Sequence, residues 1–212
     1  MTPPACPVCG VGGAAEILAG VPDHITGDPF GIRRCASCGV AFTFPVPRDL
    51  ERHYPAKYRG YGAITRSILQ AFYRLRVGGW VRGAGKPGAA LEVGCGPGLM
   101  LEALRNRGWE VTGLERTEAM ADYARKTLGL DVRSCGIEDL PREPRYDLIV
   151  LFQVLEHMRD PLAVLKDCAA RLKPGGRLLV NVPNFDSWQA RFGGAAWLHL
   201  DPPRHLFHFT PR

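Results

Sequence analysis

From about residue 89 onward, short apolar runs alternate with stretches in which apolar residues recur at helical spacing. The apolar runs predict strands over residues 90–93, 109–115, 131–135, 146–152 and 177–183. The stretches between them predict helices over residues 98–107, 118–128 and 160–176. Strands that alternate with helices build right-handed βαβ units around a parallel sheet. This part of the chain therefore predicts a doubly wound α/β fold.

The last predicted helix carries signals at both of its ends. Asp160 suits the N-cap, and Pro161 suits the first helical position, where its missing N–H costs nothing. Lys173 lies near the C-terminal end and Gly175 just beyond it, as helix ends prefer. These signals place the helix between the two last predicted strands.

The residues before this domain follow a different pattern. Residues 1–45 are rich in glycine and proline, and they are too few to bury a core without a covalent or metal staple. Residues 46–63 are a polar and aromatic connector. Residues 64–77 have helical spacing, and a glycine-rich break follows over 78–88. One apolar face of that predicted helix is formed by Ile64, Ile68, Phe72 and Leu75.

We therefore expect three parts: a small module over 1–45, a connector with an amphipathic helix over 46–88, and an α/β domain over 89–212. The composition, with 46% hydrophobic and 23% charged residues, is ordinary for a globular protein. No apolar run reaches the ~18 residues that a membrane span needs. The N-terminus lacks the basic and apolar regions of a signal peptide. A cytoplasmic location is the resulting expectation.

The positive charge is concentrated in the first part of the chain. Residues 1–88 hold 11 Lys and Arg against 5 Asp and Glu, whereas residues 89–212 hold 16 of each. Such an excess fits an acidic substrate, an anionic membrane surface or nucleic acid, and it also fits a basic face that is simply solvated. The charge alone leaves these alternatives open.

Four of the seven cysteines form two C-x-x-C pairs, "CPVCG" and "CASCG". In a reducing compartment such pairs indicate a metal more often than a disulfide. Two pairs make a closed tetrahedral site of four thiolates, which is typical of structural zinc. We expect a zinc ribbon whose ligands are Cys6, Cys9, Cys35 and Cys38. Redox pairs or free thiols are the alternatives. Nucleic acid is not the expected partner, because basic residues do not interleave with the nearby aromatic residues.

The stretch "LEVGCGPG" ends the first predicted strand of the α/β domain with three closely spaced glycines. A strand that leads through a glycine-rich turn into a helix is a nucleotide-binding arrangement. The dinucleotide fingerprint G-x-G-x-x-G would need a glycine where this chain has Leu99. The third glycine comes one residue early, at Gly98, and Pro97 removes one N–H from the turn. Both departures disfavour an NAD-dependent oxidoreductase.

Glu115 ends the second predicted strand, 21 residues after Gly94. An acidic residue at this place can accept hydrogen bonds from both hydroxyls of a ribose. A surface carboxylate at a strand end is the alternative interpretation. The turn and Glu115 together predict a nucleoside site.

Taken together, "LEVGCGPG", "VTGLE", "GIEDLP", "YDLIVLFQVLEH" and "LKPGGRLLVNVPN" resemble a class I S-adenosylmethionine-dependent methyltransferase. The resemblance is to the ubiquinone-biosynthesis O-methyltransferase-like branch, and within it to bacterial members with an N-terminal zinc module. It implies a Rossmann-like, mostly parallel sheet. It also implies cofactor contacts from Glu92, Gly94, Cys95, Gly96, Gly98, Glu115, Arg116, Gly136, Ile137 and Gln153. Members of the family often have Asp where this chain has Gly136.

The resemblance implies transfer of a methyl group to a small-molecule acceptor, at a hydroxyl oxygen or a sugar carbon. The basic front part could receive a phosphorylated or nucleotide-linked acceptor. A nucleophile of high pKa needs a general base or a metal ion. Candidate bases are His157, His205 and His208, which follow the last two predicted strands, where α/β sheets bind ligands. A structural role for His157 is the alternative. Gln153 disfavours a catalytic metal, because an amide is a poorer ligand than a carboxylate.

This family usually has seven strands, and only five are predicted after residue 89. We expect that the last two strands are missing and that strand 177–183 is an exposed sheet edge, which favours a homodimer. The alternative function is a non-catalytic module of zinc ribbon and Rossmann-like domain that binds nucleic acid or a protein partner.

Overall fold

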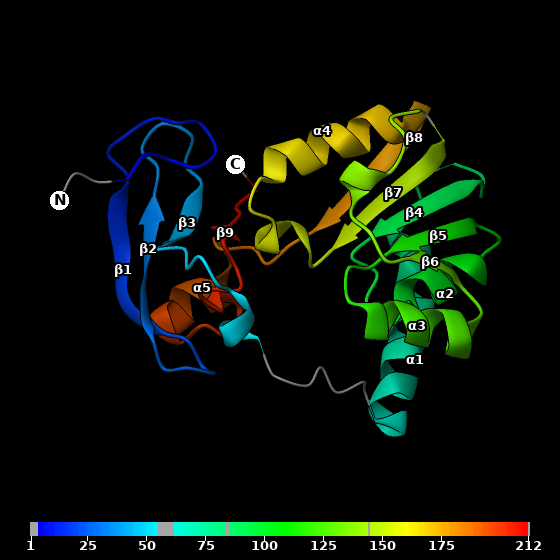
Figure 1. The fold of residues 1–212 in the computed structure, drawn as a ribbon, viewed down its shortest axis with the longest axis horizontal. Helices are drawn as coiled ribbons and strands as arrows, with labels where there is room; N and C mark the ends of the chain where they lie inside the picture. The colour runs from blue at the N-terminus through cyan, green and yellow to red at the C-terminus, as the bar shows by residue number, and fades with distance from the viewer. Residues whose placement is uncertain (1–3, 55–61, 84, 144, 212) are drawn as a thin grey trace. The chain divides into compact units, whose positions relative to one another are not determined.

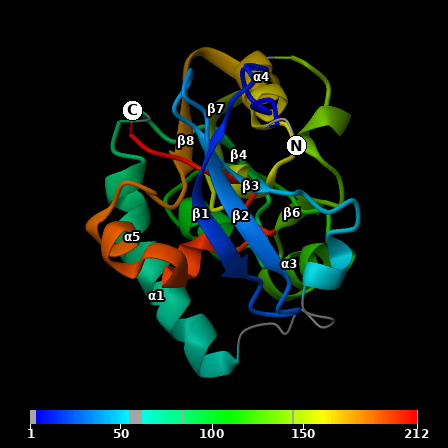
Figure 2. The same cartoon turned by 90° about the vertical axis from the view of Figure 1, so that its left-hand side faces the viewer.

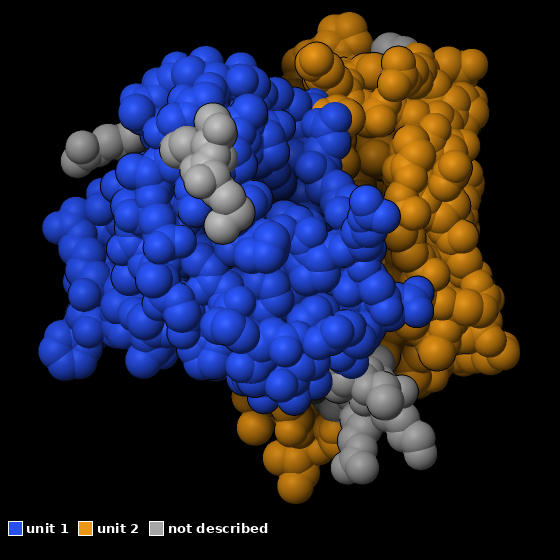
Figure 3. Space-filling view, turned by 60° about the vertical axis from the view of Figure 1, so that its left-hand side comes forward, with its two compact units in different colours: residues 1–58, 155–162, 182–212 blue, residues 59–154, 163–181 orange. Residues whose placement is uncertain are grey.

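The computed structural model describes residues 4–54, 62–83, 85–143 and 145–211. The chain divides into two compact units, which are coloured separately in Figure 3. Unit 1 contains residues 1–58, 155–162 and 182–212, and unit 2 contains residues 59–154 and 163–181. We expected all of 89–212 in one domain, but the structure assigns 155–162 and 182–212 to the same unit as the N-terminal module. Residues 55–61 of the expected connector lie outside the described residues.

Unit 2 contains the expected parallel sheet. Its five strands are β4 (Ala89–Val93), β5 (Glu110–Leu114), β6 (Asp131–Arg133), β7 (Tyr146–Phe152) and β8 (Leu172–Asn181). They are arranged in the order β6-β5-β4-β7-β8, and every neighbouring pair is parallel. The central strands β4 and β7 are almost entirely buried, as strands covered on both faces must be. The doubly wound α/β fold predicted from the sequence is confirmed.

Helices cover this sheet on both faces (Figure 1). They are α1 (Ala63–Trp80), α2 (Leu99–Arg105), α3 (Glu118–Leu128) and α4 (Pro161–Arg171), with a short helix η2 (Ile137–Asp139) after β6. Helix α1 continues through Gly78 and Gly79, where a glycine-rich break was expected. The reason is tertiary: Val77 is fully buried and Trp80 packs against the same core cluster, so burial stabilises a last turn that glycines weaken.

Strand β8 begins at Leu172, five residues before the expected start at 177, because Leu172 already pairs with Tyr146 of β7. Within the described residues β7 is the only strand that pairs with β8. The exposed edge that the sequence predicted is therefore present in this part of the chain. Pairing of that edge with a second copy of the chain remains a prediction.

Unit 1 is built around an antiparallel sheet whose strands come from both ends of the chain. Its order is β1 (Ala15–Pro22), β2 (Pro29–Arg34), β3 (Ala41–Phe44) and β9 (Phe207–His208). Figure 2 shows the first three strands side by side. Strand β9 completes the sheet by pairing Phe207 with Phe42 and His208 with Ala41. The C-terminal segment also contributes three short helices, α5 (Trp188–Gly193), η4 (Gly194–Ala196) and η5 (Leu198–Leu200).

Two small apolar clusters stabilise unit 1. One joins Cys6 and Cys35 to Phe42 and Phe207, and the other joins Ile32 and Ala41 to Leu200. In each cluster, N-terminal residues pack against residues of the C-terminal segment. The N-terminal module therefore completes its core only with the C-terminal segment in place.

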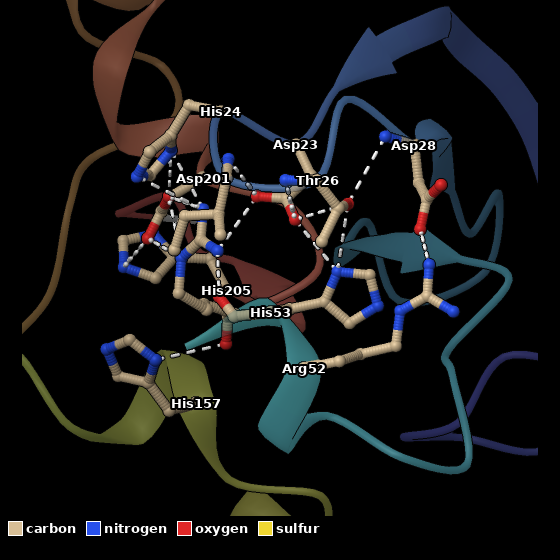
Figure 4. A network of polar contacts seen from close by, with 11 residues as sticks. Asp23, His24, Thr26, Asp28, Arg52, His53, His157, Asp201 and His205 are labelled. Atoms are coloured by element: carbon tan, nitrogen blue, oxygen red, sulfur yellow. Dashed lines mark hydrogen bonds and ion pairs between the residues drawn. The ribbon is translucent and has the colours of Figure 1, made fainter. Parts of the chain in front are cut away.

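A buried polar network also connects the N-terminal module to the C-terminal segment (Figure 4). Asp23 accepts a 2.8 Å hydrogen bond from Nδ1 of His53, which lies in the short helix η1 (Glu51–His53), and forms a 2.8 Å ion pair with Arg204. Burial alone would raise the pKa of Asp23. Hydrogen bonds, the largest of them from His53, outweigh burial and hold that pKa well below its ordinary value. The side chain of Arg204 also donates to the carbonyl oxygen of His53 and pairs with Asp201.

None of the helices in the described part of the chain combines the length and the apolar character that crossing a bilayer requires.

Candidate functional site

The glycine-rich turn between β4 and α2 lies at the carboxyl edge of the unit 2 sheet. Gly94, Gly96 and Gly98 have φ angles of 70°, 52° and 80°, in the left-handed region that favours glycine. The N–H groups of Gly94 and Cys95 both donate to the carbonyl oxygen of Leu114, at 2.7 and 2.9 Å. These bonds hold the turn against the end of β5.

The three glycines are required for two different reasons. A Cβ on Gly94 would lie 2.7 Å from Cγ2 of Val154, and one on Gly98 would lie 2.6 Å from Cδ1 of Leu130. At Gly96 no described atom lies within 4 Å of an added Cβ. Packing therefore explains Gly94 and Gly98, whereas Gly96 leaves its backbone open for a ligand to approach.

Glu115, directly after β5, is bound to this turn. Its Oε2 accepts a 2.9 Å hydrogen bond from the N–H of Gly96, and its Oε1 accepts a 2.7 Å bond from the N–H of Thr117. Each oxygen of a carboxylate has two lone pairs, so one lone pair on each remains for a ligand. Two adjacent acceptors held in this way suit a vicinal diol such as a ribose.

Glu92 is buried inside β4, and its Oε2 has no hydrogen-bond partner among the described residues. Burial raises the pKa of this carboxyl well above its ordinary value, and the charge of Glu115 raises it further. A buried carboxyl with an unused oxygen suits a cationic or hydrogen-bond-donating ligand group, which would satisfy that oxygen.

Arg116 and Glu138 form an ion pair beside Gly136. A Cβ on Gly136 would contact a guanidinium nitrogen of Arg116 and a carboxylate oxygen of Glu138, which are the ends of two exposed side chains. The N–H of Gly136 donates to Asp139 at 2.9 Å, and the side chain of Ile137 is buried. The Arg116–Glu138 pair therefore lies next to the backbone of Gly136.

Gln153 ends the row of predicted cofactor residues, just after β7. Its φ of 57° is rare for a residue other than glycine. Its N–H donates to the carbonyl oxygen of Asn181 at 2.8 Å, and its side-chain amide donates to Oδ1 of the same residue. Asn181, which sequence reasoning did not identify, thus holds Gln153 in its strained conformation.

Nine of the ten predicted cofactor residues therefore lie at or beyond the carboxyl ends of β4, β5, β6 and β7, and Glu92 lies one residue before the end of β4. This is the edge at which open α/β sheets bind ligands. The thiol of Cys95 is buried, and burial raises its pKa above the ordinary value. The roles themselves remain predictions.

The four paired cysteines of unit 1 come together as predicted. Their sulfur atoms all lie within 4.8 Å of one another. The Sγ atoms of Cys6 and Cys38 are 3.7 Å apart, and those of Cys9 and Cys35 are 3.6 Å apart. A tetrahedral zinc site with Zn–S bonds of ~2.3 Å has S···S distances of roughly 3.8 Å. The cluster therefore has the dimensions of a four-thiolate zinc site.

The two cysteine turns have the same backbone hydrogen bonds. In the first, Gly10 donates to the carbonyl of Cys6 and Cys6 donates to the carbonyl of Val11. In the second, Gly39 and Cys35 make the corresponding bonds, the latter to Val40. Backbone N–H groups, first that of Cys38 and then that of Ser37, lower the pKa of the Cys35 thiol to about 6. The matching backbone of the two turns, and the N–H donors toward the sulfur of Cys35, fit a bound metal ion.

The three candidate histidines all belong to unit 1, in which the short helix η3 (Leu155–His157) also lies. Nδ1 of His157 is 3.0 Å from the carbonyl oxygen of Arg204, and Nδ1 of His205 is 2.9 Å from that of His199. A carbonyl only accepts, so both Nδ1 atoms carry the proton and both Nε2 atoms keep a free lone pair. Burial lowers the pKa of His205 to about 4 and also lowers that of His157, which keeps both rings neutral.

His208 lies in a different environment. Its Nε2 is 3.1 Å from the hydroxyl oxygen of Thr43, and that hydroxyl donates to the carbonyl of His205 at 2.7 Å. The hydroxyl proton is thus in use, so Nε2 of His208 is the donor of this pair. The side chain is buried, and burial lowers its pKa to about 3. The lone pair of the neutral His208 ring is therefore on Nδ1, whereas in His157 and His205 it is on Nε2.

Glu156, next to His157, is not among the site residues predicted from the sequence. It is fully buried, and neither of its carboxylate oxygens has a hydrogen-bond partner among the described residues. Burial raises its pKa to about 7. Its carboxylate and the ring nitrogens of His157 and His205 lie within 4.8 Å of one another. One carboxylate and two imidazoles are a common ligand set for a divalent metal ion.

Sequence reasoning also missed the buried network of Asp23, His53 and Arg204. These residues lie far apart in the chain, with 151 positions between His53 and Arg204. Each is an ordinary polar residue in a loop or a short helix. No motif or residue spacing in the sequence therefore predicts that Asp23, His53 and Arg204 contact one another.

Comparison with known proteins identifies a family for most of the chain. A family described as "Methyltransferase domain" matches residues 64–212. The ubiquinone biosynthesis O-methyltransferase of Marinobacter nauticus is 40% identical over 104 residues, which are 45% of this chain and 44% of that protein. The enzyme of the same name from Coxiella burnetii is 39% identical over 100 residues, which are 44% of this chain and 43% of that protein. The chain thus spans less than half the length of these curated relatives.

Solved structures show the same fold at lower sequence identity. A SAM-dependent methyltransferase from Archaeoglobus fulgidus aligns with a TM-score of 0.56 and 20% identity, over 72% of this chain and 69% of that one. A SAM-dependent methyltransferase from Thermotoga maritima, described as a possible histamine N-methyltransferase, aligns with a TM-score of 0.54 and 24% identity, over 70% and 69%. The expected Rossmann-like fold is confirmed.

Proposed function

Since the chain belongs to the methyltransferase-domain family, we propose that it transfers a methyl group from S-adenosylmethionine to a small-molecule acceptor. The proposed acceptor atom is a hydroxyl oxygen or a sugar carbon, on a molecule that can carry phosphate or a nucleotide. The observation that carries the proposal is the bond between Glu115 and Gly96, which places two free acceptor lone pairs beside an open glycine backbone. O-methyl transfer is favoured by the names of the relatives from Marinobacter and Coxiella.

The residues of unit 2 would each serve the cofactor in a defined way. Glu115 would accept the ribose hydroxyls, and Gly96 would give the ligand access to the backbone of the turn. Glu92 would receive the ammonium group in its buried position. Arg116, Gly136 and Ile137 would border the adenine, and Gln153 would line the mouth of the site. The sulfonium of the bound cofactor supplies the methyl group, so the protein mainly positions the reactants and excludes water.

We further propose that Cys6, Cys9, Cys35 and Cys38 hold a structural zinc ion. The support is the tetrahedral size of the sulfur cluster and the matching pair of cysteine turns. Four thiolates leave no open coordination position, so the ion would stabilise unit 1 rather than react. We place the protein in the cytoplasm, where a reducing environment keeps the thiols available to the metal.

Two mechanisms are candidates for activation of the acceptor, a general base and a divalent cation, and both use His157 and His205. His157 or His205 could act as general base through a free Nε2 lone pair. Alternatively, Glu156, His157 and His205 could hold a divalent cation, which would supply Lewis acidity to an oxygen ligand. The two unpartnered oxygens of Glu156 favour the second candidate, because a buried carboxylate without a partner is costly.

The cofactor proposal is tested by calorimetric titration with S-adenosylhomocysteine. We expect micromolar binding that Glu115→Ala weakens by about 10- to 100-fold, because two hydrogen bonds to a carboxylate are lost. The matched control is Glu110→Ala, which changes an exposed residue at the other end of the same strand and should leave affinity unchanged. Absence of binding at high ligand concentration would contradict the proposal. Salt-sensitive nucleic-acid binding that survives Glu115→Ala would instead support the non-catalytic module.

The two candidates for activation are separated by metal content. Protein with an intact cysteine cluster should carry a second equivalent of divalent metal if Glu156 is a ligand, and Glu156→Gln should remove only that equivalent. If the wild-type protein binds only the cysteine-held ion, the general base remains and the cation is excluded. The measurement does not depend on knowing the acceptor.

A further inference from the structure

Helix α1 is held in a fixed orientation by one of its faces. Val77 on this face is fully buried in the unit 2 core. Polar contacts add to this hold: Arg66 donates to the hydroxyl of Tyr123 at 2.7 Å, and Gln70 donates to Glu102 at 2.9 Å. The attachment of α1 therefore determines which of its residues face away from the unit.

The opposite face of α1 carries a second apolar stripe. Ile64, Ile68 and Leu75 have 79%, 64% and 80% of their surface exposed, and Phe72 has 43%. Spacings of four and three residues place these side chains in one row along the helix. A continuous apolar row of this kind, rimmed by polar residues, marks an interaction surface more often than a scattered exposed residue does.

The charge around this stripe has a single sign. Between residues 63 and 88 the chain has five Lys and Arg residues and no Asp or Glu. Arg74 and Arg76 are exposed and lie on either side of Leu75 on the helix surface. The guanidinium carbon of Arg76 lies 5.9 Å from the ring centroid of Phe72, which keeps the cation next to the apolar row. Further exposed cations, Arg82 and Lys86, follow the helix.

We propose that this face of α1, defined by Ile64, Ile68, Phe72 and Leu75 with Arg74 and Arg76 beside them, docks onto an anionic lipid surface. A helix that lies in the membrane interface buries aliphatic side chains among the acyl chains while its arginines meet lipid phosphates. The absence of acidic residues from 63 to 88 matches an anionic surface. Nucleic acid fits this face less well, because aliphatic side chains neither stack on bases nor contact phosphates.

The experiment is co-sedimentation of the whole chain with two kinds of vesicles. One kind is pure phosphatidylcholine, and the other contains about one third phosphatidylglycerol, which supplies the negative surface potential. We expect binding to the anionic vesicles only, weakened by added salt because exposed charges are screened. Ile68→Ser/Leu75→Ser and Arg74→Glu/Arg76→Glu should each reduce binding by about tenfold or more.

The matched control is Trp188→Ser/Phe192→Ser, which removes two exposed aromatic residues of unit 1 that are 71% and 90% exposed. This variant should bind the anionic vesicles like the wild type. Binding that depends on Trp188 and Phe192, or that ignores the α1 variants, would overturn the proposal. A wild-type protein that does not bind anionic vesicles would also overturn the proposal. The same holds if it does not bind them and Ile68→Ser/Leu75→Ser instead abolishes self-association of the chain.

Titration with S-adenosylhomocysteine on the same variants keeps this proposal separate from the proposed function. The α1 variants should retain the affinity of the wild type, which also shows that unit 2 is folded. Vesicle binding without cofactor binding would support the lipid-docking proposal and contradict the methyltransferase proposal. Cofactor binding without vesicle binding would support the methyltransferase proposal and contradict the lipid-docking proposal.

Discussion

Different kinds of internal contact stabilise each of the two units of this protein. In unit 2, strands that follow one another through a single helix lie side by side, as β4 and β5 do, and their apolar side chains fill a common core. In unit 1, the sheet is completed by a strand from the far end of the chain, and Thr43 contacts His208 across 165 positions. Consecutive strands therefore form most of the unit 2 sheet, with β4 and β7 as the exception, whereas the unit 1 sheet needs a strand from the opposite end of the chain.

Unit 1 compensates for its small core with polar and metal-binding groups. Among the described residues its two apolar clusters contain six and four buried residues, which is few for a unit without additional links. The cysteine cluster joins the two turns of the ribbon, and the Asp23–Arg204 pair joins the ribbon to the C-terminal segment. All six histidines of the chain also fall in unit 1. The two units should therefore respond differently to metal loss, mutation and acid.

Loss of the proposed zinc should have the largest effect and should be confined to unit 1. Cys35→Ser should remove one equivalent of zinc and, with it, a folding contribution on the order of 10 kcal/mol. Hydrogen exchange read by mass spectrometry should show loss of protection in β1, β2 and β3, with β4 and β7 unchanged. The matched variant Cys135→Ser, outside the cluster, should keep its zinc. Less than about half an equivalent of zinc in the wild-type protein would contradict the metal site.

Removal of the buried cation should be the next largest effect. Arg204→Met leaves the carboxylate of Asp23 buried without its ion-pair partner, which should lower the free energy of unfolding of unit 1 by about 3–5 kcal/mol. Urea unfolding followed by fluorescence and hydrogen exchange measures this change. Arg145→Met, which removes an exposed ion pair with Glu143, should give no measurable change. Equal effects of the two substitutions would show that the buried network does not stabilise unit 1.

The glycine turn provides the corresponding test in unit 2. Gly94→Ala puts a Cβ 2.7 Å from Val154 at a φ of 70°, and the clash and strain together should cost about 3 kcal/mol of unfolding free energy. Gly96→Ala meets no described atom, so it should cost less stability and instead weaken binding of S-adenosylhomocysteine. Thermal unfolding and calorimetry on both variants separate packing from ligand access. A larger loss of stability in Gly96→Ala than in Gly94→Ala would contradict this assignment.

Acid should also distinguish the two units, because the histidines all belong to unit 1. Burial holds the pKa of His208 at about 3 in the folded state, below the ~6.5 of an unfolded chain. The neutral ring therefore stabilises unit 1 fully above about pH 6.5, and this contribution is lost as the pH falls toward 3, at up to about 1.4 kcal/mol per pH unit. Unfolding measured between pH 7 and pH 4 should be less pH-dependent in His208→Gln than in the wild type. An unchanged slope would show that His208 is not responsible.

Several features could be predicted from the sequence because they depend on neighbours in the chain. The five strands and the fold of the larger unit follow from local periodicity, and the structure confirms them. The cysteine pairs each form one turn, so their spacing already indicated that four thiols could meet, and in the structure they do. The strand ends also located the predicted cofactor residues at one edge of the sheet, although their roles await the binding experiment.

Other features could not be predicted, because they depend on contacts between distant residues. The unpartnered carboxylate of Glu156 becomes unusual only when the fold buries it beside His157 and His205. Likewise, Ile64, Ile68, Phe72 and Leu75 form an apolar face in the sequence, but only packing decided that this face is exposed while Val77 and Trp80 turn inward.

The sequence by itself determined the parallel sheet, the glycine turn and the grouping of the four cysteines, since each follows from periodicity or from spacing within a few residues. Only the tertiary structure decided that the C-terminal segment completes the N-terminal ribbon, with Arg204 buried against Asp23 and β9 paired with β3. The physical reason is that buried charges are tolerated only where the fold supplies partners for them, and these partners come from distant parts of the chain, so they leave no local pattern in the sequence.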